Sequence, residues 1–100
     1  MVQLQPLKIE GHTVLGIEVK LPKTNLLVIT TDKGYIMCGA LDVELLNKRL
    51  PDRKIVAGRA VGVRTLSDLL EAPLEMVTLE GEAQGITPGM SGRDALLKML

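Results

Sequence analysis

The alternation of residue types over positions 12–21 constrains the fold more than any other feature of this sequence. One set of alternate positions is occupied by Thr13, Leu15, Ile17, Val19 and Leu21. The interleaved set includes His12, Gly16, Glu18 and Lys20. A repeat of two residues is the period of a β-strand that buries one face. The pattern therefore predicts a long, half-buried strand whose aliphatic face packs against the core.

The segments on either side of this strand predict an antiparallel meander. Residues 2–10 fit an edge strand with a bulge, because Pro6 shifts the apolar phase and has no N–H for a ladder. The β-branched run over 26–31 is typical of a central strand. We expect a short hairpin over 32–34, with Gly34 at positive φ, to lead into a strand over 35–41.

The second half of the chain predicts short helices between the remaining strands. Asp42, Thr65 and Ser91 are each placed to cap a helix. The run over 55–64 predicts another strand, which permits one βαβ crossover from the strand over 35–41. The segment 74–84 stays open between strand and helix.

Together these elements predict one domain over residues 1–100, of class α+β. We expect a two-layer, mostly antiparallel sheet of about five to six strands with three short helices.

Charge and aromatic content argue against nucleic-acid binding. Twelve basic and twelve acidic side chains cancel, and the chain has one Tyr, no Trp and no Phe. It therefore offers neither a positive field nor a stacking platform for bases. Glycine-rich phosphate-loop patterns are missing, and His12 is the only histidine. We expect no cofactor and no metal.

Cysteine content and hydropathy suggest a location and an assembly state. A single cysteine cannot form an internal disulfide, which fits the reducing cytoplasm. The first residues lack the pattern of a signal peptide and no apolar run is long enough to span a membrane, so we expect no membrane partner. The apolar content of 46% and mean hydropathy of +0.24 are high for a small domain. We expect a homo-oligomer, most simply a two-fold dimer.

Cys38 is the centre of one candidate site. It shares a predicted strand face with Ile36 and Ala40, so the first interpretation is a buried and inert thiol. The alternative is a small-anion or metabolite site in which Cys38 supplies a reactive thiol, open at the strand end beside Asp42.

Three arginines complete the candidate ligand-binding residues. Arg59 falls among apolar residues of the predicted strand over 55–64, so it needs a partner, and Asp42 is a candidate. Arg64 lies on the same strand. Arg93 is in the first turn of the last helix, where a cation opposes the helix dipole. Arginine binds carboxylate or phosphate groups bidentately, which is why a small anionic ligand is the expected partner of such a site.

Several stretches of the chain resemble a known family. They are residues 21–25, 34–42, 55–65, 89–93 and 95–97. On these stretches the chain is similar to the YunC family, small bacterial and archaeal proteins classed as a domain of unknown function. The resemblance covers essentially the whole chain. It implies a compact, cytoplasmic α+β domain and supplies no catalytic residue.

The sequence therefore predicts a non-enzymatic binding or homo-oligomeric assembly module. The alternative is the small-ligand site of Cys38, Asp42, Arg59 and Arg64. Whether the protein is an enzyme stays open, because only arginines are plentiful among the groups that could converge on a site.

Overall fold

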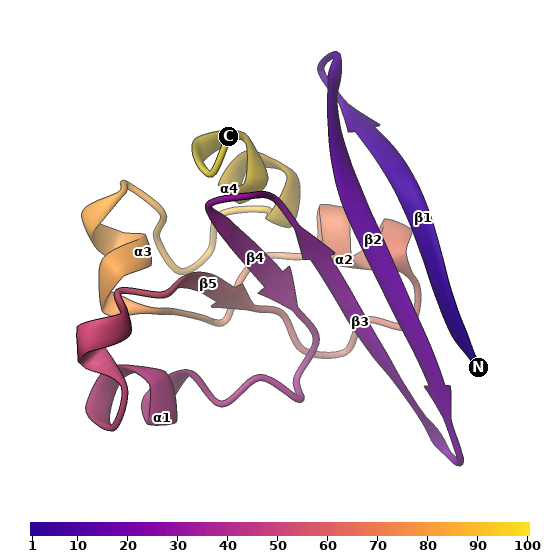
Figure 1. The fold of residues 1–100 in the computed structure, drawn as a ribbon, viewed down its shortest axis with the longest axis horizontal. Coiled ribbons are helices and arrows are strands. Elements are labelled where there is room, and N and C mark those ends of the chain that lie inside the picture. The colour runs from indigo at the N-terminus through magenta and orange to yellow at the C-terminus, as the bar shows by residue number, and fades with distance from the viewer.

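The computed structural model describes every residue of the chain except the side chain of Pro51. The elements in chain order are β1 (Val2–Ile9), β2 (His12–Leu21), β3 (Thr24–Thr30), β4 (Gly34–Met37), α1 (Val43–Lys48), the 3-10 turn η1 (Pro51–Arg53), β5 (Val56–Arg59), α2 (Leu66–Glu71), β6 (Met76–Val77), α3 (Leu79–Ala83) and α4 (Gly92–Lys98) (Figure 1). They form one body of 33 × 32 × 22 Å.

The strands form one six-stranded sheet in the order β1-β2-β3-β4-β5-β6. All neighbours are antiparallel except β4 and β5, which run parallel. The helix α1 connects these two strands, so the predicted βαβ crossover is present. The predicted class, an α+β fold with a mostly antiparallel sheet, is confirmed.

The edge strand β1 is regular, so the predicted bulge at Pro6 is wrong. Its pairing with β2 runs without interruption from Val2 opposite Val19 to Ile9 opposite His12. The N–H groups of Lys20 and Met1 donate to each other's carbonyls, at 2.8 and 3.3 Å. Because hydrogen-bonded pairs alternate along an antiparallel ladder, the nitrogen of Pro6 points to the free edge, where the ladder loses no donor.

The two faces of β2 are reversed relative to the prediction. Val14 and Gly16 are buried, whereas Leu15 and Leu21 are 37% and 44% exposed. The side of β2 that carries Gly16 faces α2, because a Cβ on Gly16 would lie 2.8 Å from Cδ1 of Leu66. The aliphatic face of β2 therefore points away from the helices.

The strand β4 is shorter than predicted, and its first residue has a different role. Gly34 is buried and does not belong to the glycines with positive φ. A Cβ there would lie 2.5 Å from the carbonyl oxygen of Val56 on β5, so the glycine permits close packing.

Cys38 comes after the end of β4, so its predicted place in mid-strand is wrong. The strand predicted over 55–64 is only β5, and Gly62, at φ +76°, lies in the loop beyond it.

The predicted helix caps are confirmed. The side chains of Asp42, Thr65 and Ser91 accept hydrogen bonds from backbone N–H groups three residues on, at the start of α1, α2 and α4. The open segment 74–84 contains both alternatives, since β6 is followed directly by α3, which Thr78 caps.

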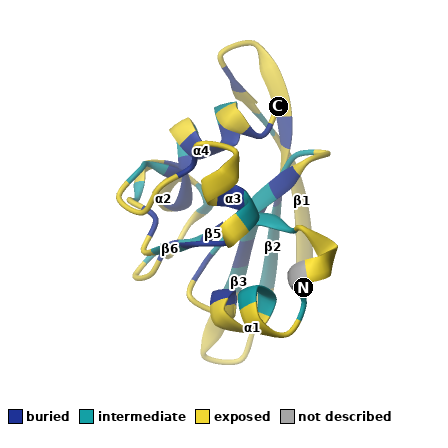
Figure 2. Ribbon diagram, turned by 90° about the vertical axis from the view of Figure 1, so that its left-hand side faces the viewer, coloured by how far each residue is buried: buried dark blue, intermediate teal, exposed yellow. Residues whose placement is uncertain are grey.

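The main core lies between one face of the sheet and the helices α2 and α4. Its fully buried side chains include Ile29, Ile36, Leu69 and Leu96. On the opposite face, α1 covers only β4 and β5, through Val43 packed with Leu41 and Ala57. Figure 2 shows α2 and α4 together on one side of the sheet, with β1 exposed along most of its length. In the described part of the chain, no helix has both the length and the apolar character needed to span a bilayer.

Candidate functional site

The first three strands carry an uncovered aliphatic face. We call it the outer face: the side of β1, β2 and β3 that points away from α2 and α4. Its nine positions form three rows across the strands: Val2 with Val19 and Leu26, Leu4 with Ile17 and Val28, and Pro6 with Leu15 and Thr30. Eight of the nine are apolar and none is charged.

This outer face is accessible. Val2 and Leu4 are 62% and 65% exposed. The helix α1 stays with β5 and η1, and in Figure 1 no helix crosses in front of β1, β2 and β3. With strands about 4.8 Å apart and same-face residues about 6.8 Å apart, the nine positions span roughly 300 Å². Apolar patches of a few hundred Å² occur on ordinary monomers and are often functional, so the outer face is a candidate interaction site.

The free edge of β1 is a weaker docking surface than the outer face. Pro6 leaves a gap in the row of N–H donors that the edge presents, and proline is one of the residues that block edge-to-edge pairing. A partner that docks here is therefore expected to use the side chains of the sheet face.

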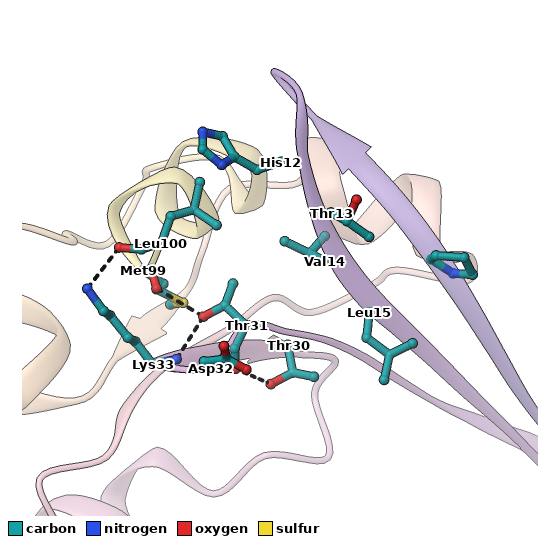
Figure 3. A pocket seen from close by; sticks show the side chains of 11 residues that line it. His12, Thr13, Val14, Leu15, Thr30, Thr31, Asp32, Lys33, Met99 and Leu100 are labelled. Atoms are coloured by element: carbon teal, nitrogen blue, oxygen red, sulfur yellow. Dashed lines mark hydrogen bonds between the residues drawn. The ribbon is translucent and has the colours of Figure 1, made fainter.

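A hollow of about 510 Å³ continues this face at the β1–β2 turn. It shares Pro6, Leu15 and Thr30 with the outer face, and its further walls include Val14, Met99 and Leu100. Figure 3 shows these side chains between the β1–β2 hairpin and the C-terminal end of the chain, with His12 at the rim. The Thr31 hydroxyl donates to the carbonyl of Met99 and the Lys33 ammonium to that of Leu100, both at 3.1 Å. Most of the lining surface is aliphatic, so the hollow extends the apolar area of the outer face.

Cys38 lies in the main core. It is 7% exposed, and its Sγ is 3.5 Å from the Leu27 N–H, which donates to it, and 3.9 Å from the Asn25 carbonyl oxygen. The thiol is on the core side of the sheet. It does not line the hollow that contains Asp42 and Arg59.

Arg59 is held by groups of the fold. Its Nη1 donates to the Leu41 carbonyl at 3.3 Å, and its Nε lies 3.3 Å from Oε1 of Glu75. The Nε–H is buried and is not directed at an acceptor, so the contact with Glu75 is an ion pair without an aligned hydrogen bond. The expected pairing with Asp42 is wrong, because Asp42 uses its carboxylate to cap α1, with Oδ1 3.0 Å from the Leu45 nitrogen.

Asp42 and Arg59 nevertheless line one hollow of about 400 Å³, together with Glu44 and the exposed Gly39 and Ala40. Its lining contains two carboxylates and one guanidinium, and that guanidinium is already paired with Glu75. This charge balance does not favour an anion.

The other predicted arginines lie elsewhere. Arg64 is exposed in the loop before α2, where its backbone N–H donates to Asp68. Arg93 on α4 binds Glu71 on α2 with Nε and Nη2, at 3.2 and 2.7 Å from Oε1. This contact with a carboxylate joins two helices. A ligand site built from Cys38, Asp42, Arg59, Arg64 and Arg93 stays a prediction, and the structure brings only Asp42 and Arg59 together.

Among the described residues, no group of three or more His, Cys, Asp and Glu side chains is placed to hold a metal ion. The sequence signal for the outer face is the alternation over residues 13–21. It predicts that the two faces of this strand differ, and the aliphatic face that we expect in the core is the one that lies outside.

These features define a class: small α+β proteins with a mixed six-stranded sheet, helices packed mainly on one face and an uncovered aliphatic area on the other. The family profile described as "Domain of unknown function (DUF1805)" matches residues 37–99. The chain is 62% identical to the uncharacterized protein YunC of Bacillus subtilis (strain 168), over 100% of this chain and 99% of that protein.

A solved structure agrees with this likeness. The crystal structure of a protein of unknown function, TA1206 from Thermoplasma acidophilum, matches with a TM-score of 0.87 and 34% identity, over 100% of this chain and 94% of that one. The chain belongs to the YunC family, a family of unknown function, as the sequence motifs predicted.

Proposed function

We propose that this protein is a non-enzymatic assembly module that forms a homodimer through its outer face. The observation that supports this proposal is the block of nine uncharged, mostly aliphatic positions on three adjacent strands, with no helix over them. Water contact with such an area is unfavourable, and burying it stabilises the assembly by about 25 cal/mol per Å².

A second copy of the chain suits this face. In a two-fold dimer the same surface meets itself, so aliphatic rows contact aliphatic rows and no like charges are brought together. Two sheets pack face to face about 10 Å apart with their side chains interdigitated, as in β-sandwiches. The face contributes roughly 300 Å² per copy, against about 800 Å² in a standard interface. The hollow beside Leu15 and the exposed Leu21 extend the apolar centre. The rest of a standard interface would come from a polar rim around this centre.

The test is a charge placed on the outer face. Leu4→Asp puts a carboxylate in the central row at a side chain that is 65% exposed, so the monomer fold has little to lose. The matched control is Leu79→Asp on α3, where the side chain is 61% exposed and lies away from the outer face.

Sedimentation equilibrium at roughly 100 μM chain, well above a micromolar Kd, gives the mass of each variant. We expect a dimer for the wild type and for Leu79→Asp, and a monomer for Leu4→Asp with unchanged circular dichroism. A monomeric wild type at this concentration would refute the proposal, and so would a Leu4→Asp variant that stays dimeric.

A further inference from the structure

A third hollow, which shares residues 30–33 with the hollow of Figure 3, carries an excess of positive charge. It lies at the amino ends of the parallel strands β4 and β5 and has a volume of about 360 Å³. We call it the basic hollow. Its lining residues are Thr30, Thr31, Asp32, Lys33, Gly34, Tyr35, Arg53, Lys54, Ile55 and Val56. Three of these are cationic and one is a carboxylate, which gives a formal charge of +2 in a chain whose net charge is zero.

The neighbouring hollows do not share this charge. The hollow beside Arg59 has two carboxylates against one guanidinium. The aliphatic hollow of Figure 3 has Asp32 against Lys33. The basic hollow is therefore a better place for an anion than the Asp42 and Arg59 hollow that the sequence predicted.

Two of its cations are available to a ligand. The ion pairs among the described residues are Lys48 with Glu44, Arg59 with Glu75, and Arg93 with Glu71, so Arg53 and Lys54 have no carboxylate partner there. Arg53 presents a planar set of N–H donors that matches the oxygens of a phosphate group, and Lys54 adds a second positive charge.

Tyr35 supplies a neutral donor to the same hollow. Burial raises the pKa of its phenol above the ordinary value, because the phenolate loses hydration. A tyrosine phenol is protonated at neutral pH at its ordinary pKa of about 10, and the raised pKa extends this range, so the hydroxyl can donate a hydrogen bond to an anion.

The backbone at Lys54 is left-handed, with φ 50°. Lys54 is the residue directly after the 3-10 turn η1, where a left-handed residue commonly ends a helical turn and glycine is the usual choice. A lysine at this position therefore keeps a positive charge where glycine would fit the backbone equally well.

We propose that the basic hollow binds the phosphate group of a small molecule. Arg53 binds phosphate oxygens through its guanidinium, Lys54 neutralises charge, and the Tyr35 hydroxyl donates a hydrogen bond. The formal charge of +2 matches a phosphate dianion. Glycine at position 54 would adopt the same backbone conformation without the charge, so Lys54→Gly removes the charge alone.

The test uses inorganic phosphate as the probe, with ionic strength held constant by potassium chloride. Backbone amide resonances of isotopically labelled protein are followed by NMR, which reports both affinity and location. A second titration uses glycerol 3-phosphate, and tighter binding of this probe would assign the site to phosphate esters in preference to the free ion. Saturable shifts over residues 53–56 with either probe support the proposal.

The variants separate a charge effect from a folding effect. We expect Arg53→Ala and Lys54→Gly each to weaken binding roughly tenfold, the loss typical of a hydrogen bond to a charged group. Lys54→Gly should fold at least as stably as the wild type, so lost binding in this variant is not unfolding. The matched control is Lys23→Gly, which removes the same charge and relieves the same backbone conformation at the distant β2–β3 turn, and it should bind as the wild type does.

Two results would overturn the proposal. One is an absence of saturable shifts in the wild type with both probes. The other is a Lys23→Gly variant that loses as much affinity as Lys54→Gly, which would assign the effect to net charge.

Discussion

Gly34→Ala tests how the parallel pair β4 and β5 is packed. An added Cβ would lie 2.5 Å from the Val56 carbonyl oxygen and 3.0 Å from Met99 Sδ. Real Cβ contacts are essentially never closer than 3.0 Å. Gly34 on β4 is paired with Val56 on β5, so the two strands would have to move apart by at least about 0.5 Å at this pair. Overpacking of this kind costs about 1–3 kcal/mol, and the upper end applies because a backbone atom cannot rotate away.

The assay is thermal unfolding followed by circular dichroism. A loss of about 3 kcal/mol lowers the Tm by roughly 12–24 °C in a domain of this size, at about 4–8 °C per kcal/mol. The matched control is Gly39→Ala, where the added Cβ would lie 3.5 Å from Val61 Cγ1 in ordinary contact. We expect its stability to stay within about 0.5 kcal/mol of the wild type.

A second variant separates crowding from backbone strain. If Gly34 were needed for positive φ, Asn would be tolerated better than Ala, because Asn enters the left-handed region more readily. Crowding predicts that Gly34→Asn is at least as destabilised as Gly34→Ala. A Gly34→Ala variant within about 0.5 kcal/mol of the wild type would refute the steric argument.

Two further predictions concern Tyr35 and Cys38. The pKa of Tyr35 is raised in the folded protein above its unfolded value of about 10. Below pH 10 the phenol is protonated in both states, so Tyr35 does not make the free energy of unfolding depend on pH. As the pH rises from 10 through the folded pKa, the unfolded chain loses the proton first and the folded protein becomes less stable. Tyr35 is the only tyrosine and the chain has no Trp, so absorbance of the phenolate reports this residue alone. We expect the midpoint of its titration to be higher in the folded protein than in the unfolded chain, and the Tyr35→Phe variant to lose less stability than the wild type above pH 10. A native titration at or below the unfolded midpoint would contradict this. Cys38, at 7% exposure, should be alkylated at least about 100-fold more slowly in the native protein than in the unfolded chain, and equal rates would show that the thiol is accessible.

Local signals in the sequence predicted most of the fold. Asp42, Thr65 and Ser91 were identified as caps because a capping side chain bonds to a backbone group only three residues away. The meander followed from turns and alternation, which are also local. The site residues were predicted less well: Cys38 and Arg59 lie on opposite faces of the sheet region, and the partner of Arg59 is Glu75. That pairing depends on how β5 and the segment before β6 are placed, which spacing in the sequence does not encode.

The sequence by itself determined the alternation of β2, the caps of α1, α2 and α4, and the family. Only the tertiary structure decided which face of β2 is buried. The alternation of residue types shows that the two faces of a strand differ, but it does not show which face a helix will cover. The buried Val14, Leu27 and Ile29 lie on the side that α2 and α4 cover, and the aliphatic rows of β1, β2 and β3 face outward. The same long-range packing brings Lys33 next to Arg53 and Lys54 across the start of two parallel strands, and so creates a basic hollow from residues that are separate in the chain.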